Sequence, residues 1–477
     1  MHLFLVICEL KLFSVLRFFR INDPYRLLGI LIILILIALP LWIDTANLTW
    51  QELKSWVVGE AISDGKLMYV QVYDDTPPLA SAFLGVMDWV FGRSVFAWQF
   101  IAFLLIFFQA SYFGIMLINN KAYEENTYLP ALIYGLLAFF SFDLFSFSPE
   151  LLASTFLLFA INNLFKEIEF RIQRDDIVLK IGVSIGLASL LVFSYAAFLP
   201  AVAFLLAIFA RITARKIFIL LSGFVLPHAV LIMLYFYWDS TPLLWQNFYL
   251  PNLYFTKHPL ISTKSLFILG LVPLAYFVFS LVMLNRVARF TRYQSQLLQV
   301  MFIWLAPSAM LIMLTRELTP HSFLVFIPIL SYFISHYFLL IRRKWIAEIM
   351  LWAFLFGIVF VGSMARYGKF RSIDYSSLLT SSDSSKPSKK IMVLGQNDKV
   401  YLTHAMGGYF LNWKLSRGIF EDVDYFENVI VIEQAFKTDP PDLIIDEKGL
   451  MEAVMERIPA LKTKYKREGT QYKKISN

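Results

Sequence analysis

The sequence has few charged residues and almost no cysteine. Only 16% of its 477 residues are Asp, Glu, Lys or Arg, against about 25% in an ordinary soluble domain. That shortage excludes a disordered chain, a nucleic-acid-binding domain and a soluble enzyme. The single cysteine, Cys8, excludes a disulfide framework and any cysteine-based zinc site.

Apolar residues dominate instead. They make up 58% of the chain, aromatics alone 17%, and the mean hydropathy is +0.63, which predicts a polytopic α-helical membrane protein. The net charge of +7 does not indicate a nucleic-acid partner, because the basic residues form short clusters between apolar runs. About eleven transmembrane helices are expected, at 27–43, 95–117, 128–142, 149–165, 179–195, 197–212, 216–237, 265–284, 297–314, 321–340 and 345–363.

The distribution of basic residues predicts how the chain crosses the membrane. If the N-terminus is cytoplasmic, the cytoplasmic segments before residue 364 hold eighteen Lys and Arg residues and the opposite loops hold six. Basic residues concentrate on the cytoplasmic side, so this orientation is favoured. It requires 179–195 and 197–212 to be two spans, because merging them would invert every later loop.

The chain divides into four predicted regions. Residues 1–26 alternate apolar and basic side chains and are expected to form a cytoplasmic interfacial helix, a cleaved signal peptide being the alternative. Residues 27–364 form the transmembrane domain, with a long outer loop at 44–94. A Ser-rich linker at 365–390 leads to a small α/β domain at 391–477, outside the membrane.

The outer loop 44–94 contains two predicted helices. In the first, Thr49 caps the helix and Glu52, three residues on, completes a capping box. Gly65 ends it. The second helix starts at Pro77-Pro78 and stops at Gly92.

The predicted α/β domain has three apolar runs that are expected to be buried strands. These are 391–394, 429–432 and 443–446, and helices are expected at 447–456 and 458–465. The lone Gly395 after the first strand does not indicate a nucleotide site, since no Gly-rich loop follows it.

Several short motifs follow one another in a defined order. The outer loop holds Gln51-Glu52, Gly65-Lys66, Tyr69, Tyr73-Asp-Asp-Thr-Pro77-Pro78-Leu79 and Phe91-Gly92-Arg93-Ser94. Further on come Gly186-Leu-Ala ahead of Pro200, and Thr315-Arg316-Glu-Leu-Thr-Pro320-His321 ahead of Pro328. In order, spacing and topology, over most of the chain, this pattern resembles the GT-C superfamily of membrane glycosyltransferases. The nearest branch is the bacterial protein-mannosyltransferase and aminoarabinose-transferase type.

Two positions depart from the family pattern. The acidic pair is Gln51-Glu52 here, so one carboxylate is missing, which bears on metal binding and on activity. The Lys before the double proline is Thr76, which removes a charge that could meet a lipid phosphate.

The resemblance implies transfer of a sugar from a polyprenyl-phosphate carrier to an acceptor on the outer side of the membrane. A carboxylate would take the proton of the acceptor hydroxyl as general base. Glu52 is the first candidate, since it matches the retained half of the acidic pair; otherwise it only caps its helix. Asp44, at the outer end of the first span, is the second catalytic candidate. Asp74 and Asp75 would position the acceptor or hold a cation, or else form a turn.

The leaving lipid phosphate would need a cationic or hydrogen-bonding partner. Arg316 is the only basic residue in its outer loop and is the leading phosphate ligand, with His321 beside it. Alternatively, Arg316 contacts lipid headgroups, and His321 is an ordinary histidine at the membrane interface. No metal-ligand spacing is present, so the cofactor stays open, a divalent cation being the one alternative.

Three functions remain as hypotheses. The leading one is an envelope glycosyltransferase whose partners are a lipid-linked sugar donor, membrane lipids and a glycan or protein acceptor. The second is a non-catalytic scaffold subunit of an envelope complex, which the residue Gln51 favours. The third is a lipid or glycan transporter, although no internal repeat is present. By family analogy we expect the cytoplasmic (inner) membrane, with the C-terminal domain in the periplasm.

Overall fold

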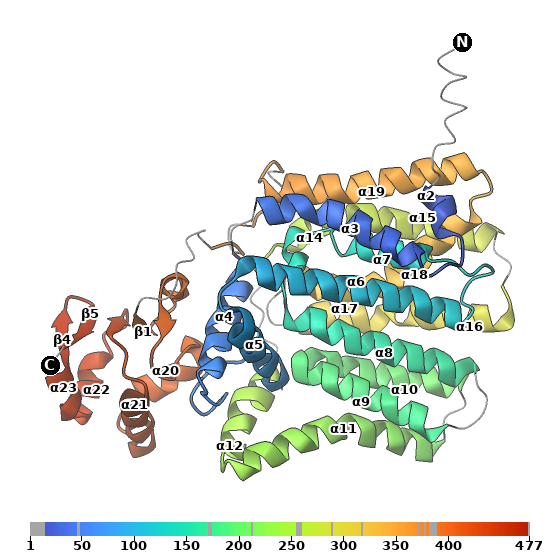
Figure 1. Cartoon of the computed structure of the whole chain (residues 1–477). Coiled ribbons are helices and arrows are strands. Elements are labelled where there is room, and N and C mark those ends of the chain that lie inside the picture. Colours follow the sequence, from blue (N-terminus) through green and yellow to red (C-terminus); the bar gives the residue numbers. More distant parts are fainter. Residues whose placement is uncertain are drawn as a thin grey trace.

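A computed structural model gives the structure of residues 15–44, 48–169, 174–210, 213–253, 260–287, 290–315, 318–370, 372–375, 378–380 and 389–475. Long helices run side by side and form one body, and a small α/β domain lies at one end of it (Figure 1). The sequence-based prediction of a polytopic helical protein with a small C-terminal sheet domain is confirmed.

A helix lies within each of the eleven predicted spans. The helices of the body are α3 (Arg26–Ile43), α6 (Val95–Asn119), α7 (Leu129–Leu137), α8 (Pro149–Glu169), α9 (Asp175–Leu191), α10 (Phe198–Phe209), α11 (Ala214–Tyr237), α14 (Thr263–Leu269), α15 (Leu271–Val287), α16 (Arg292–Ile303), α17 (Leu305–Leu314), α18 (Ile327–Leu340) and α19 (Lys344–Arg366). Among the described residues, seven helices are long and apolar enough to cross a membrane, or up to eight if the bent pair α14–α15 is one span. The count of eleven is therefore not confirmed, since helices such as α7, with 9 residues, are too short to span alone.

Short elements connect these helices. They are η1 (Phe142–Phe145), η2 (Phe193–Ala197), α12 (Thr241–Leu244), η3 (Trp245–Tyr249), α13 (Leu250–Leu253) and η4 (Pro320–Phe326). Of these, η1 and η4 matter most for the site described below.

The predicted N-terminal interfacial helix is described only in part. Residues 1–14 lie outside the described residues, and α2 (Val15–Phe19) is the part that is seen. The Glu348 carboxylate of α19 accepts the backbone N–H groups of Val15 at 2.7 Å and Leu16 at 3.1 Å. Because Leu16 and Phe19 are buried, α2 is packed onto the helical body.

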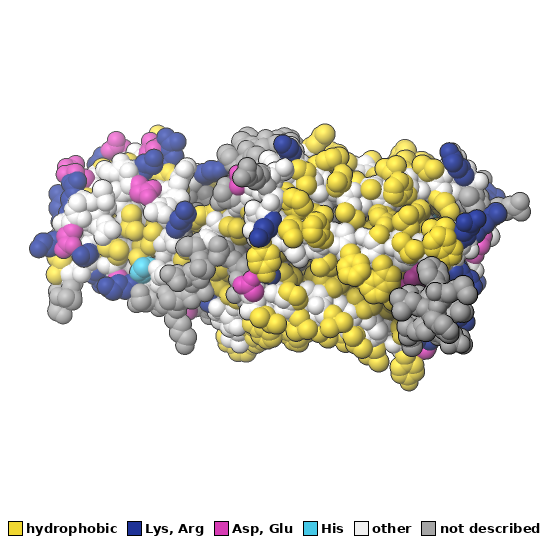
Figure 2. Space-filling model, turned by 90° about the horizontal axis from the view of Figure 1, so that it is seen from above, with side chains coloured by type: hydrophobic (Ala, Val, Ile, Leu, Met, Phe, Trp, Pro, Cys, Tyr) yellow, Lys and Arg dark blue, Asp and Glu magenta, His cyan; other side chains and the backbone are white. Residues whose placement is uncertain are grey.

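Apolar side chains cover the outside of the helical body. Figure 2 shows them as a continuous band, with basic side chains at the end far from the α/β domain. Large exposed examples are Phe218 and Phe236 of α11, at 73% and 74% exposure. A surface of this kind is stable only in lipid, so the chain is a multi-pass membrane protein.

Close helix packing explains the glycine of the Gly186-Leu-Ala motif. A Cβ atom at Gly186 of α9 would lie 2.6 Å from the Phe224 carbonyl oxygen of α11. Only glycine lets the two backbones approach so closely. The motif residue therefore has a packing role between α9 and α11.

Loop 44–94 forms the two predicted helices, α4 (Trp50–Ser63) and α5 (Pro78–Phe91). They lie across the end of the long helices, between these and the α/β domain (Figure 1). The capping box of Thr49 and Glu52 is present as predicted. Gly65 and Gly92 follow the two helices with φ angles of +87° and +56°, in the region that favours glycine.

The α/β domain is a five-stranded sheet with helices. Its strands are β1 (Lys390–Leu394), β2 (Ala405–Met406), β3 (Leu443–Asp446), β4 (Tyr465–Glu468) and β5 (Gln471–Lys474), in the order β2-β1-β3-β5-β4. β1 is parallel to β2 and β3, and β5 is antiparallel to β3 and β4. The remaining elements are η5 (Asp398–Leu402), α20 (Trp413–Glu421), α21 (Phe426–Thr438), α22 (Met451–Arg457) and α23 (Pro459–Lys464).

One predicted strand is wrong. The apolar run 429–432 lies in α21, whereas the runs 391–394 and 443–446 are strands as predicted. Ile432, Ala435 and Phe436 are buried at the spacing of one helix face. Four apolar residues alone do not distinguish a strand from a buried helical turn.

One buried ion pair and one arginine attach the α/β domain to loop 44–94. The Lys66 ammonium of the loop lies 2.5 Å from an Asp439 carboxylate oxygen of the domain, and Lys390 of the domain itself lies 2.6 Å from the other oxygen. The Arg93 guanidinium, which pairs with Glu60 of the loop at 2.6 Å, donates to the carbonyl oxygen of Tyr401 at 2.8 Å. The Lys66–Asp439 pair and the Arg93 hydrogen bond thus fix the domain against the loop that contains α4 and α5.

Asp439→Ala is expected to loosen the α/β domain. The change leaves the Lys66 ammonium, whose side chain is only 11% exposed, without its carboxylate, and breaking a buried pair costs about 3–5 kcal/mol. Limited proteolysis between residues 364 and 390 should become faster. Glu433→Ala, which breaks an exposed pair with Lys437 in the same domain, should leave the rate unchanged; equal rates in both variants would contradict this role of Asp439.

Candidate functional site

The first turn of α4 is held from two sides. Within the turn, the Glu52 Oε2 atom accepts the backbone N–H of Thr49 at 2.7 Å and its hydroxyl at 3.0 Å. From outside, the Trp50 N–H donates to the Leu378 carbonyl at 3.0 Å, and the Thr380 N–H donates to the Leu48 carbonyl at 2.7 Å. The described part of the predicted linker thus fixes the helix that carries Glu52.

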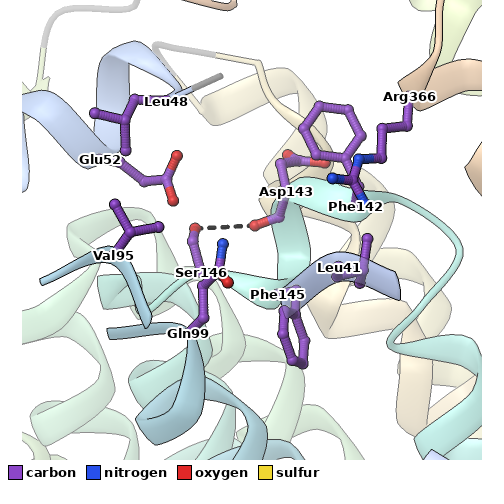
Figure 3. Close-up of a pocket in the computed structure, with 10 residues that line it drawn as sticks. All are labelled: Leu41, Leu48, Glu52, Val95, Gln99, Phe142, Asp143, Phe145, Ser146 and Arg366. Carbon is purple, nitrogen blue, oxygen red and sulfur yellow. Dashed lines mark hydrogen bonds between the residues drawn. The ribbon is translucent and has the colours of Figure 1, made fainter. Parts of the chain in front are cut away.

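Glu52 shares a pocket with a second acid, Asp143 of η1. This pocket, which we call the carboxyl pocket, is small, with a volume of about 20 Å³, which is room for about one water molecule. Figure 3 shows the Glu52 carboxylate directed toward Ser146, with Asp143 on the opposite side of the pocket. Its lining residues are Leu41, Leu48, Glu52, Val95, Gln99, Phe142, Asp143, Phe145, Ser146 and Arg366.

Asp143 is buried at the turn between α7 and α8. The Ser141 hydroxyl donates to its carboxylate, and the Ser146 hydroxyl donates to its backbone carbonyl at 2.9 Å. His321 of η4 lies beside both groups: its Nε2 is 3.4 Å from the Ser146 hydroxyl and its Nδ1 is 4.0 Å from a carboxylate oxygen of Asp143. Nδ1 is buried and makes no hydrogen bond to any described residue.

Burial makes both carboxyls weaker acids. Loss of solvent raises the pKa of Glu52 above its usual value, against the hydrogen bonds from Thr49, which lower it. Burial raises the pKa of Asp143 to about 7, and the nearby Glu52 charge adds to the shift. With a pKa of about 7, Asp143 can exchange a proton near neutral pH, which suits acid–base chemistry in this pocket.

A larger cavity, with a volume of about 170 Å³, adjoins the carboxyl pocket. We call it the helix-end cavity. It shares Glu52 and Ser146 with the carboxyl pocket and is lined by 21 residues that include Lys54, Asp75, Thr76, Glu150, Phe193, Thr315 and His321. The structure thus brings the predicted residues Glu52, His321 and Asp75 to one space.

Asp74 and Asp75 form an ion cluster with Lys54 of α4. The Lys54 ammonium is 3.2 Å from Asp74 and 2.5 Å from Asp75. Asp74 is buried and also accepts the N–H of Thr76 at 2.9 Å. Burial raises the pKa of Asp74, whereas the Lys54 charge lowers it. Lys54 therefore supplies a cation beside Thr76, where the family pattern has lysine.

Of the remaining two predicted residues, only Asp44 is described. The exposed Asp44 accepts the Tyr367 hydroxyl at 3.0 Å and lies 3.7 Å from the Arg366 guanidinium, but it does not line either cavity. Arg316 lies outside the described residues. Its neighbour Thr315 lines the helix-end cavity, and the Leu318 carbonyl accepts the N–H of Leu260 at 3.2 Å.

The sequence analysis missed Asp143 and Arg366. Asp143 is the only acid between α7 and the first residue of α8, flanked by Ser and Phe residues, and an acid in an apolar stretch is a usable signal. Arg366 is the last residue of α19, and a basic residue at the C-terminus of a helix is usually explained by its favourable interaction with the helix dipole. Only the folded chain places its nearly buried guanidinium in the wall of the carboxyl pocket.

The residues do not form a metal site in the described part of the chain. No group of three or more His, Cys, Asp or Glu side chains there has the spacing to hold a metal ion. One Glu52 oxygen is occupied by Thr49, and His321 Nδ1 is 4.0 Å from Asp143. The proposed transfer reaction therefore includes no divalent cation.

Comparison with known proteins identifies the fold. The chain matches the crystal structure of ArnT, an aminoarabinose transferase from Cupriavidus metallidurans, bound to undecaprenyl phosphate, with a TM-score of 0.54 and 13% identity, over 93% of this chain and 97% of ArnT. The apo structure of the same enzyme gives a TM-score of 0.54 and 12% identity over the same shares. No family model and no curated sequence matches the chain. The resemblance to the GT-C membrane glycosyltransferases is thus confirmed for the fold.

Asp143→Asn is expected to change how thermal stability depends on pH. Because the pKa of Asp143 is higher in the folded state (about 7) than its ordinary value of 3.8, the folded protein binds the proton more tightly. The contribution of protonated Asp143 to the free energy of unfolding is therefore full below about pH 4. This contribution declines as the pH rises to about 7, by at most about 1.4 kcal/mol per pH unit.

This dependence can be measured by melting the purified protein from pH 4 to 8. The Tm of wild type should fall relative to that of Asp143→Asn up to about pH 7 and then run parallel to it. Asp64→Asn, at the exposed end of α4, is the matched control and should follow wild type. Parallel curves for Asp143→Asn over the whole range would show that this carboxyl has an ordinary pKa.

Proposed function

We propose that the chain is a glycosyltransferase that moves a sugar from a polyprenyl-phosphate donor to an envelope acceptor. The observation that carries the proposal is the pair of carboxyls, the half-buried Glu52 and the buried Asp143, in one pocket beside the helix-end cavity. Two acids with raised pKa values in a concave site are typical of acid–base chemistry. The ArnT-like fold, with undecaprenyl phosphate bound in one ArnT structure, supports a lipid-linked donor.

Glu52 would act as the general base. The acceptor hydroxyl oxygen forms a bond to the anomeric carbon, the bond from that carbon to the phosphate oxygen breaks, and the hydroxyl proton passes to the carboxylate. Thr49 holds one oxygen of Glu52 while the carboxylate faces the pocket (Figure 3). Asp143 would influence the protonation of Glu52 or take the proton itself. It would also provide a second acid near Glu52, in place of the acidic residue that the family pattern has at the position of Gln51.

The leaving lipid phosphate would lie in the helix-end cavity. Lys54 and His321 line that cavity, and Arg366 lines the adjoining carboxyl pocket. Arg316 remains the proposed phosphate ligand of the sequence analysis, following the lining residue Thr315. Lys54 and Arg366 would stabilise the charge that develops on the departing phosphate. Burial lowers the pKa of His321 to about 4, so this histidine would contribute as a neutral hydrogen-bond donor.

The proposed topology places this chemistry on the outer face of the cytoplasmic membrane. The N-terminus would be cytoplasmic, and α4, α5 and the α/β domain would be periplasmic. The basic side chains at the opposite end of the body support this orientation (Figure 2). The acceptor would be a glycan or a protein of the envelope.

Glu52→Gln tests the proposed base. A glutamine preserves the capping box, because Gln also serves at this position, but it cannot accept the proton. Transfer should fall about 10²- to 10⁴-fold with little change in Tm. The measurement is a mass profile of surface glycans and glycoproteins from a deletion strain that carries wild type or the variant.

Asp64→Asn is the matched control, since it changes an acid on the same helix away from both cavities, and it should restore the wild-type profile. If Glu52→Gln also restores that profile, Glu52 is only a helix cap. If deletion itself changes no glycan, the transferase proposal is overturned in favour of a scaffold subunit.

A further inference from the structure

A short segment between α19 and the α/β domain contacts both elements that carry the acids of the carboxyl pocket. We call its described residues, 372–375 and 378–380, the strap. The Ser265 hydroxyl of α14 attaches the strap to the helical body: it donates to the Ser372 carbonyl at 3.4 Å and accepts the Asp374 N–H at 3.2 Å. Four side chains of the strap are buried: Ile373, Tyr375, Leu378 and Thr380. The strap is therefore packed against the helical body.

The later part of the strap holds the residues that precede α4. Leu379 pairs with Thr49 in an antiparallel bridge. Thr380 donates to the Leu48 carbonyl twice, from its N–H at 2.7 Å and from its hydroxyl at 2.9 Å. Because the N–H and the hydroxyl of Thr49 bind the Glu52 carboxylate, the strap reaches Glu52 through one intervening residue.

Tyr375, in the earlier part of the strap, lies beside Asp143. Its ring packs edge-on against Phe142 of η1, with ring centres 5.0 Å apart. Its hydroxyl lies 3.3 Å from the Ser141 hydroxyl, which in turn donates to the Asp143 carboxylate. Burial raises the pKa of Tyr375, and the Asp143 charge raises it further, so the phenol keeps its proton. Two hydroxyls in series thus connect the strap to Asp143.

The number of protons fixes the direction of the hydrogen bonds in this series. A serine hydroxyl has one proton to donate, and Ser141 donates it to the ionised Asp143 carboxylate. The Ser141 oxygen therefore accepts the proton of the Tyr375 hydroxyl. Each hydrogen bond in such a chain polarises the next, so Tyr375 strengthens the donation from Ser141 to the carboxylate.

Other titratable and charged groups face Asp143 from three further elements. Glu52 of α4 and Arg366 of α19 line the same pocket, and His321 Nδ1 of η4 lies 4.0 Å from the Asp143 carboxylate. A negative charge on Glu52 opposes the ionisation of Asp143. The two neutral hydroxyls can be removed while all three of these groups stay in place, so their effect is separable.

From this geometry we propose that Tyr375 is a positioning residue of the carboxyl pocket, which orients the Asp143 carboxylate through the Ser141 hydroxyl and favours its ionised form. Tyr375 lines neither cavity, so it acts through Asp143 and not on a substrate. The strap thereby joins the segment that leads into the α/β domain to both acids of the pocket. The role in catalysis rests on the proposed transferase function, whereas the effect on Asp143 is measurable without it.

The test is a titration of Asp143 in the full-length purified protein in lipid nanodiscs. Infrared difference spectra from pH 4 to 9 would follow the protonated carboxyl band that Asp143→Asn removes. Tyr375→Phe keeps the ring beside Phe142 and removes only the hydroxyl, so the midpoint of this band should rise by about 0.3–0.6 pH unit, the size of one lost polarising bond. Ser141→Ala removes the direct donor and should raise the midpoint by about 1–2 pH units.

Two comparisons show whether the effect passes through the series of hydroxyls. Tyr367→Phe is the matched control, because Tyr367 is 55% exposed and its hydroxyl donates to another carboxylate, that of Asp44, at 3.0 Å. This control should titrate as wild type does. In the Ser141→Ala background, Tyr375→Phe should cause no further rise, since the tyrosine acts through the serine.

The outcomes separate the two proposals. If the midpoint of Tyr375→Phe equals that of wild type or falls, or if it rises equally with and without Ser141, the positioning role is overturned, whatever Glu52→Gln does to transfer. If the midpoint rises only when Ser141 is present but deletion changes no glycan, Tyr375 positions Asp143 and the transferase proposal fails.

Discussion

The hydrogen bonds at the N-terminus of α4 hold the rest of the site in place. A helix leaves its first N–H groups without partners inside the helix, and here two separate segments supply them or fix their surroundings. Thr49 and Glu52 close the capping box, while Leu378 and Thr380 pair with the residues on either side of Thr49. Glu52 is therefore a structural group and a pocket carboxylate at once, which joins stability to the chemistry proposed for it.

Two cavities meet at this turn of α4. The carboxyl pocket holds Glu52 and Asp143, and the adjoining helix-end cavity holds His321 and Lys54. The buried pair of Lys66 with Asp439 attaches the α/β domain to the loop that contains this turn, so the position of α4 depends on the domain as well as on the helical body.

Hydropathy and local signals predicted much of this fold. The membrane helices, the capping box at Thr49, the glycine ends of α4 and α5 and two of three strands follow from patterns that act over a few residues. The strand expected at 429–432 is wrong, because its neighbours Ala435 and Phe436 extend a helical face beyond the four residues considered. The number of spans is not confirmed, because α7 and its neighbours are short.

The site was predicted only in part, for a physical reason. Glu52, Asp75 and His321 were chosen by motif and meet at one cavity. Asp143 and Arg366 were not, because burial of a lone acid and of a helix-end arginine depends on contacts between segments hundreds of residues apart. Sequence motifs thus identified the helix that carries Glu52, the proposed base, and missed its surroundings.

The most direct test is the position of a bound polyprenyl phosphate in an experimental structure of the full chain in a lipid nanodisc. The account predicts its phosphate in the helix-end cavity, within hydrogen-bond reach of His321 or Lys54 and next to the Glu52 carboxylate. A phosphate bound at the opposite end of the helical body, or on its apolar outer surface away from α4, would contradict the account.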